Sequence, residues 1–302
     1  MTHRIFVTGA TGTVGNAVMR SLSADSRDGR IALAGAARSP AAAERLRGQG
    51  FAAVEFDFDR PETLRPALRG VDAVFLATGY SVEMLVQSKR LLDAAAAEGV
   101  GHVVHLGAHA PADTPHAHFA WHQLVERAIG GMGFSFTHLH PNFFMDTVWQ
   151  GFRHRPDRLV HFVGTRDVSW IAAEDIAAVA ACALRDPARH AGQSYKLASE
   201  CLSFPDLAAL LSRETGREVR YTPRPAADLL PNLLRQGMEP SYAAGLADGV
   251  AAIEAGAFPG AAEVFDTVRT VTGRAPVTWV DFVRARRADL PDVTTSGRSA
   301  PS

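Results

Sequence analysis

The sequence predicts an α/β protein with a doubly wound parallel sheet and a smaller C-terminal α/β lobe. Short apolar segments alternate with amphipathic segments through the first half of the 302 residues, with short connections between them. A glycine-rich turn separates the first apolar segment from the first amphipathic one. In such a sheet this turn lies at the carboxyl edge of the strands, where these folds bind their ligands.

The alternating elements can be assigned in order along the first half. A helical period of apolar residues and a proline at the first position of 40–49 favour helices, and Gly99 ends the longest of them. The expected strands are 4–8, 31–37, 51–56, 72–77, 102–107 and 134–139, and the expected helices are 14–23, 40–49, 61–69, 81–98 and 117–130.

After Pro141 the alternation loosens, which sets the expected domain division. We expect a dinucleotide-binding domain over 1–150, a substrate lobe over 151–289 with some segments returning to the first sheet, and a disordered tail over 290–302. After Pro141 the patterns predict helices at 142–153, from about 174 and at 204–215 capped by Ser203, a strand at 194–198, and a loop within 223–240.

Composition limits the classes of function. Hydrophobic residues make up 47%, charged residues 21%, and the net charge is −1, which gives no electrostatic case for nucleic acid or a membrane surface. Cys182 and Cys201 have no metal-ligand spacing and suit a reducing compartment. With no leader pattern and no long apolar run, we expect a cytoplasmic protein, a monomer or homodimer, acting on a small apolar or aromatic molecule.

The turn in the segment FVTGATGTVGNAV carries glycines at every third position. Gly9 permits the tight turn, Gly12 permits close approach of a pyrophosphate, and Gly15 permits close packing of helix on strand. The helix that follows presents free N–H groups to phosphate oxygens. In this βαβ context the GxxGxxG spacing predicts dinucleotide binding rather than an ordinary turn. Thr8, Thr11 and Thr13 add hydroxyls within reach.

The ends of the next strands indicate which dinucleotide binds. The second strand ends in Ala37-Arg38-Ser39, without the carboxylate that holds the ribose hydroxyls of NAD. Arg38 can pair with a 2′-phosphate, so NADPH is favoured over NADH, although a surface arginine is the alternative. Asp57 and Phe58 would flank the adenine, and the run Ala77-Thr78-Gly79 would pass under the adenosine ribose.

These segments together resemble a known family. VTGATGTVG, ARSP, FDFDRPETL, VFLATG, GVGHVVHLGA and HPNFFM occur in an order similar to the NmrA-like group of atypical short-chain dehydrogenases, over about residues 4–185. The group includes quinone and triphenylmethane-dye reductases and NADP-binding regulators. The resemblance implies a Rossmann domain and NADPH. It implies cofactor contacts from Gly9, Thr11, Gly12, Thr13, Val14, Arg38, Asp57, Phe58, Ala77, Thr78 and Gly107, with Pro141, Asn142 and Phe143 beside the nicotinamide.

The usual proton donor of short-chain dehydrogenases, Tyr-x-x-x-Lys, does not occur in this sequence, because no tyrosine has a lysine four residues later. The helix at 117–130 carries His122 instead, a candidate donor because imidazole titrates near neutral pH. Glu126, one turn later, could orient it. A polar helix residue without a catalytic role is the alternative reading of His122.

Histidines and aromatic residues gather in the middle of the chain. Eight of the 12 histidines lie between His102 and His140, but no carboxylate or cysteine stands in a ligand spacing with them, so no metal site is expected. His109 is expected to line the substrate pocket instead. The other expected substrate-lining residues are Tyr80, Trp121 and Phe144.

The sequence therefore favours an NADPH-dependent reductase that delivers hydride to a conjugated acceptor such as a quinone, enone, imine or dye. A tailoring step on an aromatic natural product is one such role. Two alternatives stay open: a non-catalytic NADP sensor that binds another protein, and an isomerase or epimerase with tightly bound cofactor. Turnover of NADPH separates the first reading from both others.

Overall fold

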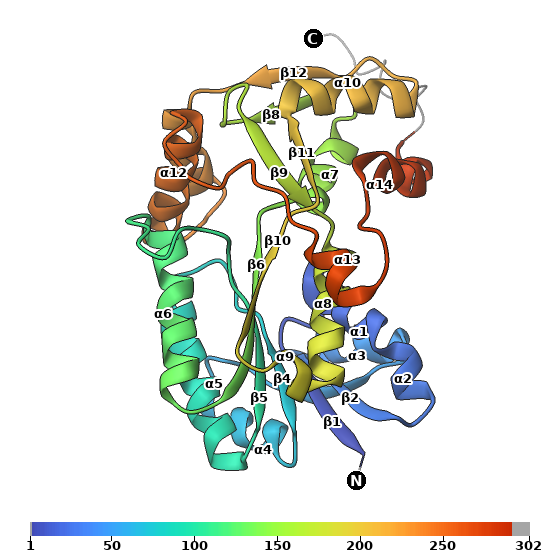
Figure 1. Ribbon diagram of the computed structural model, residues 1–302, viewed down its shortest axis with the longest axis vertical. Coiled ribbons are helices and arrows are strands. Elements are labelled where there is room, and N and C mark those ends of the chain that lie inside the picture. The colour runs from blue at the N-terminus through green and yellow to red at the C-terminus, as the bar shows by residue number, and fades with distance from the viewer. Residues whose placement is uncertain (1, 292–302) are drawn as a thin grey trace, which may run out of the picture.

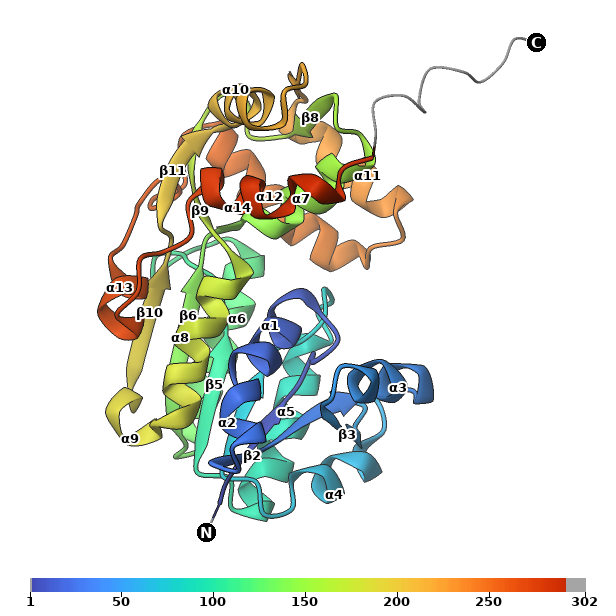
Figure 2. The same ribbon diagram turned by 90° about the vertical axis from the view of Figure 1, so that its right-hand side faces the viewer.

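A computed structural model describes residues 2–291 and shows two lobes, one above the other (Figures 1 and 2). The lower lobe is built on a seven-stranded parallel sheet of order β10-β6-β5-β4-β1-β2-β3. Its strands are β1 (His3–Val7), β2 (Ile31–Ala37), β3 (Ala52–Glu55), β4 (Ala73–Leu76), β5 (His102–Leu106), β6 (Ser135–Pro141) and β10 (Gln193–Leu197). The expected doubly wound fold is confirmed.

Helices cover both faces of this sheet because the strands are apolar on both sides. One face buries Ile5, Val7 and Phe75 under helices that include α1 and α8, and the other buries Phe6, Val74 and Leu76 under α4, α5 and α6. The helices of this lobe are α1 (Thr13–Ser21), α2 (Ser23–Arg27), α3 (Pro40–Gly48), α4 (Leu64–Leu68), α5 (Met84–Glu98), α6 (Ala117–Gly131), α8 (Ala173–Arg185) and α9 (Pro187–His190).

The upper lobe has its own core around two tryptophans. Trp170 and Trp279 are fully buried and contact edge to face, with ring centroids 5.3 Å apart. A three-stranded sheet of order β11-β9-β7 and a pair β12-β8 carry this core. The elements are β7 (Phe143–Phe144), α7 (Met145–His154), β8 (Arg158–His161), β9 (Asp167–Ile171), β11 (Glu200–Ser203), α10 (Phe204–Thr215), β12 (Arg220–Pro223), α11 (Leu229–Arg235), α12 (Pro240–Glu254) and α14 (Trp279–Arg286).

The chain crosses between the lobes several times. After β9 in the upper lobe, α8 packs against α1 and β10 joins the lower sheet beside β6 (Figure 1). A short helix α13 (Thr267–Thr272) also packs on α8. The second half of the chain therefore contributes the strand β10 and the helices α8, α9 and α13 to the first lobe, and the domain boundary at residue 150 remains a prediction.

One local expectation is wrong in its bounds. The helix expected over 142–153 begins at Met145, because Phe143 and Phe144 instead pair with Trp170 and Ile171 of β9. The segment 223–240 contains the expected loop, at 236–239, and also α11, whose Leu229 and Leu233 face the upper core. The cap at Ser203 is confirmed, since its hydroxyl accepts the Asp206 N–H at 3.2 Å.

Of the expected tail, Leu290 is buried, and residues 292–302 lie outside the described residues. Over the described residues, no helix combines the length and apolar character that crossing a membrane requires.

Candidate cofactor and substrate site

The turn between β1 and α1 is closed so tightly that side chains are excluded from it. Gly9 has φ +59°, a conformation that favours glycine. A Cβ on Gly15 would lie 2.2 Å from the Gly9 carbonyl oxygen, and one on Gly12 would lie 3.2 Å from the same atom. Gly9 and Gly15 therefore bring the start of α1 against the end of β1, as expected, and the approach of a pyrophosphate at Gly12 remains a prediction.

This arrangement leaves the N-terminus of α1 open to a ligand. Gly12 is the N-cap residue, and within the described chain no side chain caps the helix there. Thr11, Gly12 and Thr13 border a polar hollow of about 330 Å³. Backbone N–H groups and the helix dipole at such an end suit phosphate oxygens, so these residues fit the pyrophosphate of a dinucleotide. Val14 and Gly15 are buried beneath them.

The residues expected around the adenosine lie along the same edge of the sheet. Arg38 follows the last residue of β2 and is exposed, so its guanidinium is free to meet a phosphate. Asp57 has a local partner, because its Oδ1 accepts the Asp59 N–H at 3.0 Å. Phe58 is half-buried, and its ring neighbour is Phe56, 5.0 Å away between centroids. Of these residues, Arg38 has the clearest freedom to bind a cofactor.

The segment after β4 is fastened to the glycine turn. The Thr8 hydroxyl accepts the Ala77 N–H at 2.8 Å, and a Cβ on Gly9 would lie 3.5 Å from the Ala77 Cβ. Thr78 and Gly79 continue along this edge to Tyr80, which is 70% exposed. The ends of β1 and β4 are thus held as one unit on which a ribose could rest.

The ends of β5 and β6 form the next part of the edge. The Gly107 N–H donates to Leu139, and the His109 N–H donates to the Pro141 carbonyl at 3.0 Å, so the two loops run together. His109 is buried, with Nε2 3.4 Å from the Glu263 carboxylate. Burial, followed by the charge of Lys196, lowers the pKa of His109.

Asn142 connects this edge to the upper lobe. Its side-chain nitrogen donates to the Ser169 hydroxyl at 2.7 Å and to the Gly260 carbonyl at 3.1 Å. Phe143 packs edge to face on Trp170, with centroids 5.6 Å apart, and Phe144 lies against the lower core. These three residues therefore carry the junction of the lobes, and their expected contacts with nicotinamide and substrate remain predictions.

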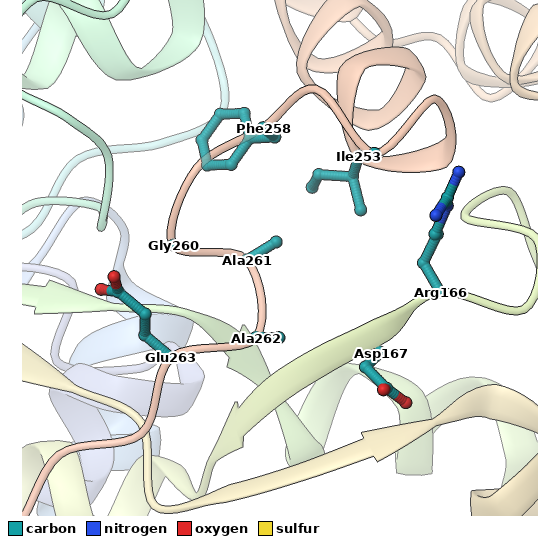
Figure 3. Close-up of a pocket in the computed structure, with 9 residues that line it drawn as sticks. Arg166, Asp167, Ile253, Phe258, Gly260, Ala261, Ala262 and Glu263 are labelled. Carbon is teal, nitrogen blue, oxygen red and sulfur yellow. The ribbon is translucent and has the colours of Figure 1, made fainter.

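The loop over 256–265 lies across His109 and Asn142. A Cβ on Gly260 would lie 2.7 Å from His109 Nε2, so the loop touches that ring directly. On its outer side the loop borders a hollow of about 390 Å³. Figure 3 shows this loop running from Phe258 past Gly260 to Glu263, opposite Arg166 and Asp167. None of the residues that line this hollow belongs to the predicted cofactor site.

A cluster of aromatic rings, called the aromatic wall below, lies between α6 and α12, on the side of the site opposite the loop over 256–265. Trp121 stacks on Tyr242 at 5.6 Å, and Tyr80 approaches the same ring at 5.9 Å. His118 meets Tyr242 edge to face at 5.3 Å, and His122 lies one turn further along α6. Burial lowers the pKa of His118 to about 4 and that of His122 to about 3, so both rings are neutral at pH 7. The wall is uncharged.

Glu126 does not orient His122, contrary to the expectation from its place on the helix. Its Oε1 lies 2.8 Å from His140 Nε2 and 3.8 Å from His105 Nδ1. The side chain points down toward β5 and β6 because those strands place histidines beneath the helix. The fold thus gives these histidines the nearby carboxylate that the linear spacing did not show.

Two residues of the upper lobe were missed from sequence. Tyr242 is 2% exposed and anchors the aromatic wall, and Glu239 caps α12 through the N–H groups of Ser241 and Tyr242. Glu239 also accepts the Val82 N–H at 3.4 Å, which links α12 to the loop after β4. The sequence signal was a glutamate before a proline at a helix start, which is common in helices of every function.

Comparison with known proteins adds to this geometry. Residues 1–255 match the NmrA-like family. The chain belongs to that family. It is 34% identical over 290 residues to an NAD(P)H azoreductase of Xenophilus azovorans, covering 94% of this chain and 98% of that protein. The comparison confirms the expected enzyme class, an NAD(P)H-dependent oxidoreductase.

Two solved structures share the fold of this NmrA-like chain at 25% identity, each covering 93% of it and 99% of the other protein. The NADPH-dependent quinone oxidoreductase QOR2 of Escherichia coli, complexed with NADPH, superposes with a TM-score of 0.78. The triphenylmethane reductase of Citrobacter, complexed with NADP(H), gives a TM-score of 0.77.

Proposed function

We propose that this protein is an NADPH-dependent reductase of conjugated small molecules, such as azo compounds, quinones or triphenylmethane dyes. The observation that carries the proposal is the open N-terminus of α1, cradled by Gly9 and Gly12, on the same sheet edge as an uncharged aromatic wall. A phosphate-binding turn alone would suit many proteins. Its combination with an apolar wall suits hydride transfer to a flat acceptor.

In this proposal the backbone of residues 11–15 holds the pyrophosphate and Arg38 pairs with the 2′-phosphate. The bound cofactor supplies hydride. Trp121 and Tyr80 orient the acceptor and exclude water from one side, and the buried Tyr242 supports both rings. The names of the similar proteins, an azoreductase, a quinone oxidoreductase and a dye reductase, support acceptors that delocalise incoming charge.

We propose that water supplies the accompanying proton and that His122 is a residue of the aromatic wall. His122 is neutral at pH 7, since burial lowers its pKa to about 3, and Glu126 pairs with other histidines. The substitution His122→Asn tests this assignment. Loss of a general acid costs about 100-fold to 10,000-fold in kcat, whereas loss of a wall residue should cost about 10-fold or less.

Cofactor titration followed by turnover tests the function. NADPH and NADH are titrated separately by nicotinamide fluorescence, and then an azo dye, menadione, a triphenylmethane dye and a polycyclic aromatic quinone are added while absorbance at the nicotinamide band is followed. We expect tighter binding of NADPH and steady oxidation with at least one acceptor. Binding without turnover would favour the sensor, and product formation without net oxidation would favour the isomerase. A cytoplasmic location and a monomeric or homodimeric state remain predictions from the sequence.

A further inference from the structure

A cluster of histidines and one carboxylate is buried between α6 and the sheet. His105 of β5 and His138 of β6 stand opposite each other in the parallel register, and Glu126 reaches them from α6. One ligand atom from each of the three lies within 4.8 Å of the other two. Three successive elements, β5, α6 and β6, thus place two imidazoles and a carboxylate around one point.

One ring nitrogen of each histidine in this cluster, Nδ1, lacks a hydrogen-bond partner in the described structure. His105 is 2% exposed and His138 is 4% exposed, and the Nδ1 atom of each is buried with no partner in the described structure. A buried polar atom without a partner costs about 1–3 kcal/mol, so native structures pair nearly all of them or use them to bind an ion. Two such nitrogens beside a carboxylate need a common explanation.

We propose that His105, His138 and Glu126 bind a divalent transition-metal ion, with Zn²⁺ the expected occupant. Two histidines and a glutamate form an established zinc ligand set. Burial lowers the pKa of both imidazoles, so they are neutral at pH 7, and the neutral ring is the form that binds metals. The free coordination position would face His122, whose ring lies 5.6 Å from that of His105 and whose Nδ1 has no partner in the described chain.

The cluster needs a small contraction to take the ion. Tetrahedral zinc with bonds of about 2.0–2.1 Å holds its ligand atoms roughly 3.3 Å apart, so the present separations of up to 4.8 Å must shorten. His140 Nε2, 2.8 Å from Glu126 Oε1, would hold the carboxylate in place. The side chains would make this movement, because the three backbones are held by the sheet and by α6.

The site would stabilise the sheet edge that carries the proposed cofactor site. A Cβ on Gly107 would lie 2.8 Å from Glu126 Oε1, so the cluster sits directly behind the loop after β5. A metal there would tie α6 to β5 and β6. This contribution to stability does not depend on the proposed reductase activity.

Metal binding is tested on the full-length protein without a histidine tag, after treatment with a chelator and dialysis. We expect one equivalent of Zn²⁺ by mass spectrometry of the metal, a visible absorption band with one equivalent of Co²⁺, and a higher melting temperature with the ion than without. Glu126→Gln and His138→Asn should each weaken Zn²⁺ by at least about 100-fold, more than loss of an outer hydrogen-bond partner costs.

The matched control is His161→Asn, because His161 is another histidine whose buried Nδ1 has no partner in the described chain, and it lies in the upper lobe. It should bind Zn²⁺ as the parent does. Circular dichroism of each metal-free variant shows whether it is folded, and a folded variant is required for the comparison. The proposal is overturned if the parent binds less than one equivalent, or if binding survives in the folded Glu126→Gln and His138→Asn proteins.

Discussion

At the scale of single residues, the glycine turn depends on the absence of a few side-chain atoms. Gly12 and Gly15 have ordinary backbone angles, so their role is to lack a side chain where the Gly9 carbonyl approaches. Gly9 adds a positive φ. Gly9 is thus favoured by its backbone conformation, and Gly12 and Gly15 by the space that they leave, although the sequence shows the three as one repeated motif.

Gly15→Ala should destabilise the protein and abolish cofactor binding. Its Cβ would lie 2.2 Å from the Gly9 carbonyl oxygen, so the turn must open, at a cost of about 1–3 kcal/mol. Thermal unfolding and NADPH titration measure both effects. Gly48→Ala is the control, since no described atom lies within 4 Å of that Cβ. Equal melting temperatures for the two variants would contradict this account.

Arg38→Ala should weaken NADPH by about 10–100-fold, the value of a charge-assisted contact with phosphate. Affinity for NADH, which lacks the 2′-phosphate, should change by less than about threefold. Fluorescence titration of both cofactors gives the ratio. Arg220 is an exposed arginine of β12 in the upper lobe, and the control substitution Arg220→Ala should leave the ratio of the two affinities unchanged. An equal loss for both cofactors would assign Arg38 a structural role instead.

At the scale of elements, α6 carries two surfaces on one helix. Trp121 turns toward α12 and contacts Tyr242, while Glu126 turns toward the strands and contacts His140. Beneath α6 and around it, burial keeps the imidazoles neutral, because a charged ring would lose its solvation there. Apolar side chains at these positions would have no such desolvation cost. This concentration of neutral histidines predicts a characteristic response to acid.

Unfolding free energy should fall as the pH drops below about 6.5. Burial, followed by the charge of His190, lowers the pKa of His102 from 6.5 to about 4. The unfolded chain therefore takes up a proton in this range and the folded chain does not. The stabilisation is complete above pH 6.5 and is lost toward pH 4, by at most about 1.4 kcal/mol per pH unit for each such histidine.

Urea unfolding at pH 7.5, 6.0 and 5.0 measures this slope, with chelator present. His102→Gln removes one titrating group, so its unfolding free energy should depend less steeply on pH than that of the parent. The comparison uses the slope and not the absolute stability, because the variant also changes the hydrogen bonds of His102 to Ser135 and Thr137. Identical slopes would show that His102 titrates normally in the folded protein.

At the scale of the whole molecule, side chains fasten the two lobes along the site. Gln150 of α7 donates to the Thr13 hydroxyl at 3.3 Å, and Asn142 donates to Gly260. Glu239 of α12 accepts from Val82. These contacts reach the glycine turn, the end of β6 and the loop after β4. The upper lobe is therefore hydrogen-bonded to the lower lobe at three points along the site.

Glu239→Ala should raise KM for the acceptor several-fold with little change in NADPH affinity. The substitution removes the cap of α12, worth about 0.5–2 kcal/mol, together with the contact to Val82, and so loosens the wall around Tyr242. Steady-state kinetics and cofactor titration separate the two effects. Glu239→Gln retains a capping oxygen and should behave more like the parent. A change in NADPH affinity alone would contradict this assignment.

Much of the lower lobe could be predicted because its signals are local. Apolar runs, the glycine spacing and Arg38 after the second strand all lie within a few residues of what they determine. The upper lobe was harder. Phe143 and Phe144 read as the start of a helix, and only their pairing with β9, more than twenty residues later, makes them a strand. Tyr242 gave no signal, since its partner Trp121 is remote in sequence.

By itself, the sequence determined the parallel sheet, the family and the turn that suits a dinucleotide, because backbone angles and hydrophobic periodicity are properties of neighbouring residues. Only the tertiary structure decided the partners of long side chains. Glu126 could reach His122 along its helix, but it turns to the half-buried His140 and the buried His105, because the sheet beneath offers these imidazoles at 2.8 Å and 3.8 Å. Electrostatic interactions between side chains depend on their distances in space, and spacing along a helix does not determine those distances.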